Sequence, residues 1–300
     1  MDDSGGNAGL GGAAAAAGSA VVAPPPVPAA AAAVAAAGPA DAARGGGRLC
    51  VCLRVRPLSR ADVAATIRVV DDSSIEVLPP GGGGAPGGRF MFDRVLGPDA
   101  GQAEVYAAVA PGLVRDAVVE GKSALLFAFG ATGSGKSHSI VGTEGAPGLL
   151  PRALKDLFAL LGECGGATPD GGTLSADVSF LEVYQDAIFD LLVPPPARGA
   201  ARKKLDLKEG AGHRVYCKGL VQKPVDGVAD ALLLLAAGKR TRAVAETLLN
   251  SDSSRSHSVF TVTLLRRDPA GAPDRVWAQV CALGRRHRCH RAARAGARVC

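Results

Sequence analysis

A glycine-rich loop that directly follows a short apolar segment constrains the fold of this chain more than any other feature. Residues 122–129 read KSALLFAF and residues 130–137 read GATGSGKS. Gly130, Gly135, Lys136 and Ser137 have the spacing G-x-x-x-x-G-K-[ST], which is typical of phosphate-binding loops. Glycines let consecutive backbone N–H groups point at phosphate oxygens without clashes from Cβ atoms. The pattern therefore predicts a buried strand, a phosphate-binding loop and a helix, in that order.

The same loop predicts a site for a nucleoside triphosphate with Mg²⁺. Lys136 can reach the β- and γ-phosphates, and the Ser137 hydroxyl can ligate the metal ion. Gly133 adds backbone freedom within the loop. These residues predict binding, and they leave open whether the nucleotide is hydrolysed.

Strand patterns alternate with helical patterns along the rest of the chain. Alternating apolar residues predict strands near residues 49–55 and 258–265, and apolar residues at helical spacing predict a helix over residues 148–162. Pro111 and Gly112 predict a break between two helices. This order of elements indicates an α/β domain with a mixed central sheet and helices on both faces.

Composition divides the chain into three parts. Residues 1–47 are rich in Ala, Gly and Pro, lack aromatic residues and predict a disordered leader, with neither the basic start nor the unbroken apolar stretch of a secretory signal. Residues 48–283 have the alternating apolar and polar patterns of a folded domain. Residues 284–300 hold six arginines and no acid, and they account for the whole net charge of +6. We therefore expect no specific nucleic-acid binding by the folded part, and no apolar run predicts membrane insertion.

The seven cysteines show no CxxC pair. Cys50 and Cys52 lie two residues apart on a predicted strand, which places both on one face. This spacing predicts neither a disulfide framework nor a zinc site, and we expect buried reduced thiols.

Residues 250–257, NSDSSRSH, gather small hydroxyl side chains around an arginine between a predicted helix and a predicted strand. Such a loop could place Ser254 on a metal-bound γ-phosphate and leave Arg255 to pair with a group that moves when the phosphate leaves. The alternative is an ordinary serine-rich connection.

Four segments in order resemble the kinesin motor domain: LRVRP (53–57), FAFGATGSGKSHSIVG (127–142), FLEVYQDAIFDLL (180–192) and LNSDSSRSHSVF (249–260). The resemblance implies the P-loop NTPase-type fold of kinesin motors, with ATP and Mg²⁺ as cofactors. It also implies microtubules as the partner, ATP hydrolysis coupled to microtubule-based movement, and a location in the cytoplasm on the cytoskeleton. A finer resemblance points to the mitotic kinesin-like subfamily that acts in cytokinesis.

The resemblance also implies a role for individual residues. Lys136, Ser254 and Arg255 would be catalytic, and Ser137 and Ser254 would ligate Mg²⁺. Residues expected to contact the nucleotide are Arg54, Arg56, Pro57 and His138 near the adenine, Gly130, Ala131, Thr132, Gly133, Ser134, Gly135, Lys136 and Ser137 around the phosphates, and Asn250, Ser253 and Ser254 in the first switch. For Arg54 and Arg56, the alternative is a pair of strand residues that reach solvent.

The resemblance stops near the end of the chain. Kinesins carry a second switch close to DLAGSE after the strand that follows the first switch, and this chain reads CALGRRHRCH over residues 281–290. We therefore expect a motor domain that is truncated before the second switch, without the main tubulin-binding helices or a dimerisation coiled coil. Two functions stay open: a microtubule-stimulated ATPase, and a non-motile nucleotide-binding or interaction fragment. The arginine-rich tail could be a polyanion-binding segment or the product of a reading-frame or splicing error.

Overall fold

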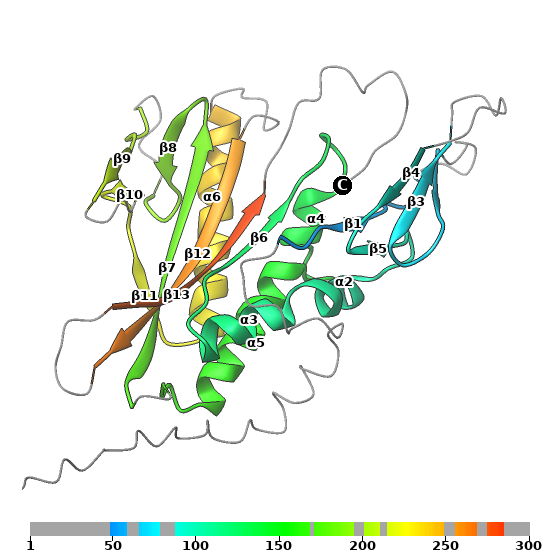
Figure 1. Cartoon of the computed structure of the whole chain (residues 1–300). Coiled ribbons are helices and arrows are strands. Elements are labelled where there is room, and N and C mark those ends of the chain that lie inside the picture. Colours follow the sequence, from blue (N-terminus) through cyan, green and yellow to red (C-terminus); the bar gives the residue numbers. More distant parts are fainter. Residues whose placement is uncertain are drawn as a thin grey trace, which may run out of the picture.

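The computed structural model describes residues 49–58, 66–78, 88–168, 171–194, 201–210, 215–248, 256–268 and 275–284. The predicted leader and all but the first residue of the arginine-rich tail lie outside these ranges. The described residues form a large mixed sheet, a layer of helices and three small sheets (Figure 1).

The central sheet has the strand order β11-β7-β12-β13-β6, and β8 pairs with β7 outside this path. Its strands are β6 (Ala124–Ala128), β7 (Thr173–Tyr184), β8 (Ala187–Asp190), β11 (Lys223–Val225), β12 (Ser256–Arg267) and β13 (Arg275–Gly284). β13 runs parallel to β6, and the other pairs are antiparallel. The predicted mixed central sheet is therefore confirmed.

Five helices are described: α2 (Gln102–Val109), α3 (Pro111–Val119), α4 (Lys136–Ile140), α5 (Leu149–Glu163) and α6 (Val228–Leu248). As predicted, the chain breaks between α2 and α3, where Pro111 supplies the first residue of the second helix. The hydroxyl of Tyr106 in α2 donates a hydrogen bond of 2.6 Å to Asp156 in α5. This bond fixes α2 against the longer helix.

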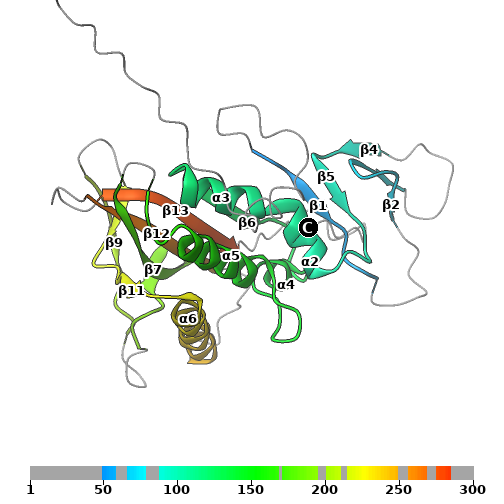
Figure 2. The ribbon, with the colours of Figure 1, turned by 90° about the horizontal axis from the view of Figure 1, so that it is seen from below.

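One face of the central sheet packs on the helices. Phe260 pairs with Phe180 on one side and with Ala282 on the other, and Ala282 pairs with Leu126. Residues paired in this way point to the same face of a sheet. All four are buried in one core with apolar residues of α3, α5 and α6. Figure 1 shows α6 lengthwise beside β7 and β12, and Figure 2 shows it nearly end-on.

The opposite face of the sheet is less covered. Leu125 and Phe127 of β6 alternate with the buried residues of that strand and are 55% and 45% exposed. No described helix packs on this face. The expectation of helices on both faces is thus met on one face within the described residues.

Helix α6 approaches the sheet closely at Gly238. A Cβ atom at this position would overlap the ring of Phe180, whose edge packs against Phe260 with 5.3 Å between ring centroids. Only a residue without a side chain allows this contact between helix and sheet. Gly238 therefore sets the distance between α6 and β7.

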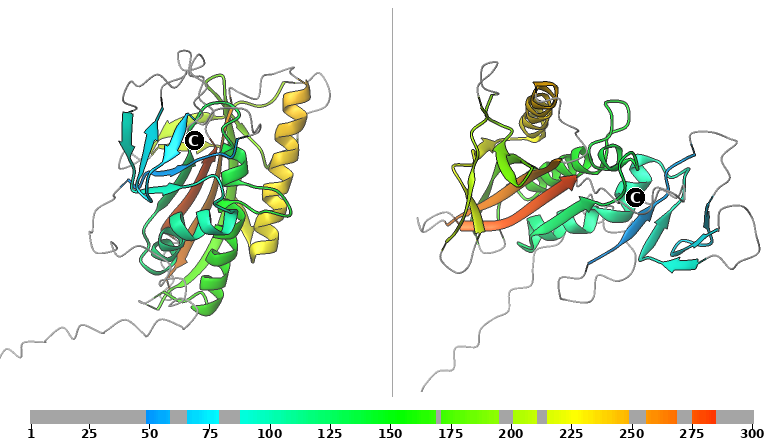
Figure 3. Two further views of the ribbon diagram at one scale, coloured as in Figure 1. Left: turned by 90° about the vertical axis from the view of Figure 1, so that its right-hand side faces the viewer. Right: turned by 90° about the horizontal axis from the view of Figure 1, so that it is seen from above.

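The small sheets lie outside the central one (Figure 1, Figure 3). β1 (Cys52–Arg54) pairs in parallel with β5 (Arg94–Leu96), and β2 (Ile67–Val69), β3 (Ser74–Val77) and β4 (Gly88–Met91) form an antiparallel sheet. β9 (Asp206–Glu209) and β10 (Val215–Lys218) form a separate antiparallel pair. A second, smaller core of Leu53, Ile75 and Val95 joins β1, β3 and β5.

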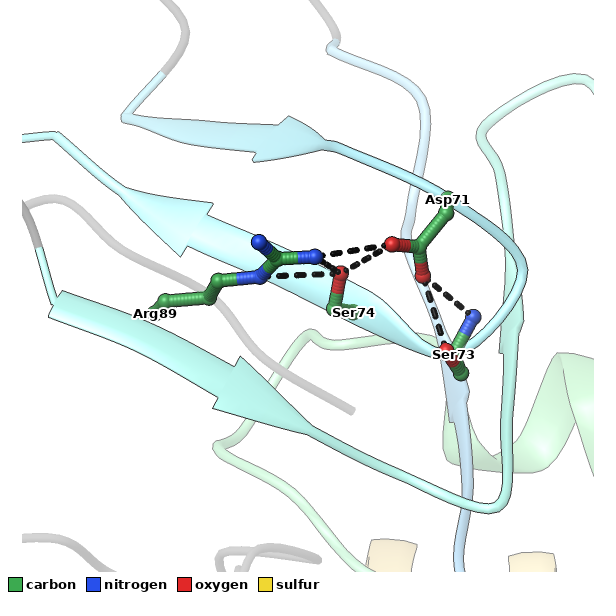
Figure 4. A network of polar contacts seen from close by, with 4 residues as sticks. All are labelled: Asp71, Ser73, Ser74 and Arg89. Carbon is green, nitrogen blue, oxygen red and sulfur yellow. Dashed lines mark hydrogen bonds and ion pairs between the residues drawn. The ribbon is translucent and has the colours of Figure 1, made fainter.

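A polar network closes the turn between β2 and β3 (Figure 4). The Asp71 carboxylate accepts hydrogen bonds from the amide and hydroxyl of Ser73 and from the hydroxyl of Ser74, and it pairs with Arg89 at 2.9 Å. The bond from Ser74, then those from Ser73, lower the pKa of Asp71 below its ordinary value. The charged carboxylate therefore fastens the turn to β4.

None of the described helices is long and apolar enough to cross a membrane. The described cysteines are free thiols, as expected, but none of them is fully buried: Cys50 is exposed, and Cys52, Cys164, Cys217 and Cys281 are half-buried. Cys50 departs most from the prediction. It precedes β1, which belongs to a small sheet and not to the main core.

We expect Gly238→Ala to lower the free energy of unfolding by about 1–3 kcal/mol, because the added methyl group overpacks the contact with Phe180. Gly162→Ala is the matched control, since Gly162 lies in α5 with open space around its Cα. That control should gain stability, by up to about 1 kcal/mol, from the higher helix propensity of alanine. Urea unfolding measures both values, and equal effects of the two substitutions would contradict the close approach.

Candidate functional site

The predicted phosphate-binding loop joins β6 to α4. β6 ends at Ala128 and α4 begins at Lys136, as the sequence pattern predicts. Gly135, directly before α4, has φ of 104°, a backbone conformation that side-chain-bearing residues rarely adopt. The turn therefore requires a glycine at this position of the motif.

Lys136 is buried within this loop. Its side chain is 5% exposed, and its Nζ donates hydrogen bonds to the backbone oxygens of Gly130 at 2.8 Å and Ala131 at 2.6 Å. These bonds place the ammonium group inside the curve of the loop. An anion bound there would meet a preorganised positive charge.

A cavity of about 820 Å³ opens in front of the loop. It is lined by Arg54 and residues 56–58, by Pro98 and residues 100–102 around the start of α2, by residues 133–139 and by Ala146. The cavity brings together nine of the predicted site residues, which are Arg54, Arg56, Pro57, Gly133, Ser134, Gly135, Lys136, Ser137 and His138. Gly130, Ala131 and Thr132 lie just before this part of the loop and do not line the cavity.

Arg54 spans the cavity wall from β1 to two other elements. Its guanidinium donates hydrogen bonds to Oε1 of Gln102 at 2.8 Å, to Oγ of Ser139 at 3.0 Å and to the backbone oxygen of Ala100 at 3.3 Å. Gln102 in turn donates to the backbone oxygen of His138 at 2.6 Å. Arg54 therefore does not simply reach solvent, because it ties β1 to α2 and α4.

Arg56 and His138 form the exposed rim of the cavity. The Arg56 guanidinium donates a hydrogen bond to the backbone oxygen of Gly133 in the loop. Partial burial, followed by the positive charges of Arg54 and Arg56, lowers the pKa of His138. A neutral imidazole ring is the expected form at neutral pH, and such a ring can stack on a planar ligand.

Sequence reasoning missed Gln102, Ser139 and Ala100. Gln102 is buried at the first turn of α2, yet nothing about an isolated glutamine in a helical pattern indicates a binding role. Ser139 lies two residues after the phosphate-loop motif, outside its defining positions. One signal could have indicated both residues. A guanidinium has five N–H donors, so an arginine on a predicted strand such as Arg54 needs hydrogen-bond acceptors from other segments.

A second hollow of about 380 Å³ shares Lys136, Ser137 and His138 with the first. Lys239 and Arg242 of α6 and Ser258 of β12 also line it. The phosphate loop is thus also adjacent to two cationic side chains of α6, which do not line the first cavity.

Arg242 belongs to a buried ionic network behind the second hollow. It donates to the carboxylate of Glu182 at 3.2 Å and to the hydroxyl of Ser256 at 2.6 Å. Arg202 donates to the other oxygen of the same carboxylate at 2.7 Å, and its guanidinium lies 4.3 Å from the centre of the Phe189 ring. The network joins α6 to β7 and to the first residue of β12.

The predicted first-switch residues Asn250, Ser253, Ser254 and Arg255 lie outside the described residues. Their position is bounded on both sides: α6 ends at Leu248 and β12 begins at Ser256. Arg242, six residues before the end of α6, donates a hydrogen bond to Ser256, so this part of α6 lies beside the start of β12. Arg242 also lines the second hollow.

The residues present fit a nucleoside phosphate. The buried Lys136 ammonium, the glycine turn and the flanking cations provide the charge and the close backbone approach that a polyphosphate requires. Ser137 is exposed and lines the cavity, so its hydroxyl is available as one oxygen ligand for a hard cation. Within the described residues no group of three or more His, Cys, Asp and Glu side chains could hold a metal ion.

Known proteins with similar sequences belong to a family of nucleotide-binding motors. The family model of the kinesin motor domain matches residues 54–282. Kinesin-like protein KIN-14Q of Arabidopsis thaliana is 34% identical over 220 residues, which are 72% of this chain and 18% of that protein. Kinesin-like protein KIF22 of Mus musculus is 33% identical over 234 residues, which are 74% of this chain and 33% of that protein. The chain thus spans a third or less of the length of these relatives.

A solved structure is similar over most of the described fold. It is a KIF14 dimer in a two-heads-bound state, with AMP-PNP and in complex with a microtubule. The similarity has a TM-score of 0.67 at 30% identity and covers 78% of this chain and 67% of that one. The subfamily is not decided by these relatives and stays a prediction.

We expect the ring of His138 to titrate below its ordinary pKa of about 6.5. Because the folded-state pKa is lowered, the unfolded chain binds this proton more tightly, and the free energy of unfolding decreases as pH falls through about 6.5. The decrease ends below the folded-state pKa. NMR titration of the ring signals measures the value. Arg56→Gln should raise it, whereas Arg68→Gln, on β2, should leave it unchanged; a ring that titrates at or above 6.5 would contradict this environment.

Proposed function

The chain belongs to the kinesin motor domain family, and we propose that it binds ATP with Mg²⁺ in the cavity before α4 as part of a microtubule-based motor. In this proposal, ATP hydrolysis is coupled to microtubule binding. The observation that carries it is the buried Lys136 ammonium inside a glycine loop, at the floor of a cavity of about 820 Å³. The chain then acts in the cytoplasm, on the microtubule cytoskeleton.

Each segment of the cavity has a role in this proposal. Lys136 exchanges its backbone partners for the β- and γ-phosphates, and loop amides contact the remaining phosphate oxygens. Arg56, Pro57 and His138 border the adenine, with Arg54 holding this wall in place through Gln102 and Ser139. Ser137 and, in the first switch, Ser254 are the proposed ligands of Mg²⁺, which when bound neutralises phosphate charge. Asn250, Ser253 and Arg255 complete the proposed site.

The proposed microtubule contact includes the small sheet of β9 and β10. Exposed lysines gather on and around it, at positions 203, 204, 208, 218 and 223. Asp206 and Glu209 are the exposed acids of the same strands. The excess of positive charge suits the acidic surface of tubulin, and an extended hairpin outside the main sheet is accessible to a large partner.

A second function has its own supporting observation. β13 ends at Gly284, where kinesins continue into the second switch, and the sequence continues with RRHRCH instead. Phosphoryl transfer depends on positioned charges around the γ-phosphate. A chain without that switch would bind nucleotide and release phosphate slowly. Steady-state phosphate release with and without microtubules separates the two functions, because only the motor predicts stimulation.

We expect Lys136→Ala to weaken Mg-ATP binding by about 10- to 100-fold, since the contact of a charged group with phosphate contributes about 1.5–3 kcal/mol. Isothermal calorimetry or a fluorescent nucleotide measures the affinity. Lys155→Ala, on the exposed surface of α5, is the control and should bind as the unaltered chain does. Equal affinity of Lys136→Ala and the unaltered chain would refute the proposed site.

We expect Lys208→Glu combined with Lys218→Glu to lower microtubule affinity by about 3- to 10-fold at low salt, with a smaller effect at high salt. Co-sedimentation with microtubules measures the bound fraction. Lys122→Glu combined with Lys155→Glu makes the same change of charge elsewhere. If both pairs have the same effect, the β9–β10 surface has no special role and only net charge matters.

A further inference from the structure

Cys50 and Cys52 bring two thiols together at the beginning of β1. Their Sγ atoms are 3.7 Å apart. Cys50 is exposed and Cys52 is half-buried, so the pair is accessible from solvent. Neither residue lines the nucleotide cavity, and the proposed function uses neither of them.

The backbone between the two cysteines is tied to the neighbouring segment. The amide of Val51 donates to the Asp93 carboxylate at 2.8 Å, and the backbone oxygen of Val51 accepts from the Asp93 amide at 3.0 Å. The second bond continues the parallel pairing of β1 with β5 by one residue. Both thiols therefore project from a segment whose path is fixed.

This geometry disfavours a disulfide between the two residues. A disulfide requires sulfurs about 2.05 Å apart and Cβ atoms about 3.5–4.5 Å apart. The Cα atoms of residues i and i+2 of an extended chain are about 6.6 Å apart, which is two rises of about 3.3 Å. Because both side chains point to the same face, their Cβ atoms are about as far apart, which is outside the range for a disulfide. Closing the bond would bend the chain at Val51 and break its two hydrogen bonds with Asp93. The pair is better placed to share a ligand than to react with itself.

We propose that Cys50 and Cys52 form a two-thiolate site for a soft monovalent metal ion, with Cu(I) as the representative. A metal–thiolate bond is about 2.3 Å long, so two sulfurs on opposite sides of an ion are about 4.6 Å apart. The observed separation of 3.7 Å is about 1 Å shorter. Rotation of the exposed Cys50 side chain about χ1 supplies that difference without moving the backbone.

The donor set decides which ion fits. Soft thiolate ligands favour Cu(I), whereas a structural Zn²⁺ site takes four ligands in a tetrahedron. No group of three or more potential ligands exists within the described residues, so the pair offers only two sulfurs. The neighbouring Asp93 carboxylate adds negative charge beside the site and is already occupied by the Val51 amide.

Binding involves no electron transfer. Two thiols and one Cu(I) give a bis-thiolate complex and release two protons to solvent. The complex links residues on either side of Val51, at the start of the strand that carries Arg54 to the cavity. The site is therefore independent of the nucleotide, although it lies on a strand that supports the nucleotide cavity.

Anaerobic titration of the full chain with Cu(I) held by a coloured chelator such as bicinchoninate tests the proposal. Loss of the chelator's colour reports transfer of a single ion to the protein. We expect Cys50→Ser and Cys52→Ser each to lower the affinity by at least about tenfold. The double variant should lose little more than either single one, because both sulfurs are needed. Unchanged circular dichroism of Cys50→Ser, an exposed position, excludes misfolding.

Single cysteines elsewhere provide matched controls. Cys164→Ser and Cys217→Ser should leave the affinity unchanged, since neither thiol has a close sulfur partner among the described residues. Cys289→Ser combined with Cys300→Ser examines the two cysteines that follow β13. Loss of binding in that variant, or full binding by the Cys50→Ser, Cys52→Ser double variant, would overturn the proposal.

Discussion

The parallel pairing of β13 with β6 is the interaction on which the candidate site depends. Ala282 and Val280 of β13 lie opposite Leu126 and Ala124 of β6, and within the described sheet β13 is the partner of β6. The phosphate loop begins where β6 ends. Without this pairing, the loop would be attached to the helices but not to the rest of the sheet. The phosphate loop thus relies on β13, the strand after which the resemblance to kinesins stops.

A buried ionic network fixes the side of the site nearest the predicted first switch. The Glu182 side chain is 4% exposed and is paired with two guanidinium groups, one of which also binds Ser256. Removing one partner from such a network costs about 3–5 kcal/mol, because the remaining charges stay buried and unpaired. Arg242 of α6 and Ser256 of β12 are therefore held to each other and to β7 by charge and hydrogen bonding.

Local sequence patterns predicted the parts of the site that are local in sequence. The turn at Gly135 and the position of Lys136 follow from one short motif. The resemblance to kinesins placed Arg56 and His138 at the same cavity, and the structure brings them together. The brace from Arg54 to Gln102 could not be predicted, because it joins residues 48 positions apart through side chains alone. The prediction that Cys50 is buried was wrong. Alternating apolar residues indicate a strand, but they do not show whether that strand joins the central sheet or a small sheet outside the main core.

The hydrogen bonds that Lys136 makes within the loop determine which ligands gain free energy by binding there. Its ammonium group already has two backbone oxygens as partners at 2.8 and 2.6 Å. A phosphate that takes this cation must replace those bonds, so the net gain is the difference between a charge-assisted contact and two contacts to neutral oxygens. A neutral ligand of the same shape gains nothing from the exchange. The loop therefore selects ligands by their negative charge as well as by their shape. This selectivity follows from the hydrogen bonds that Lys136 makes before any ligand binds.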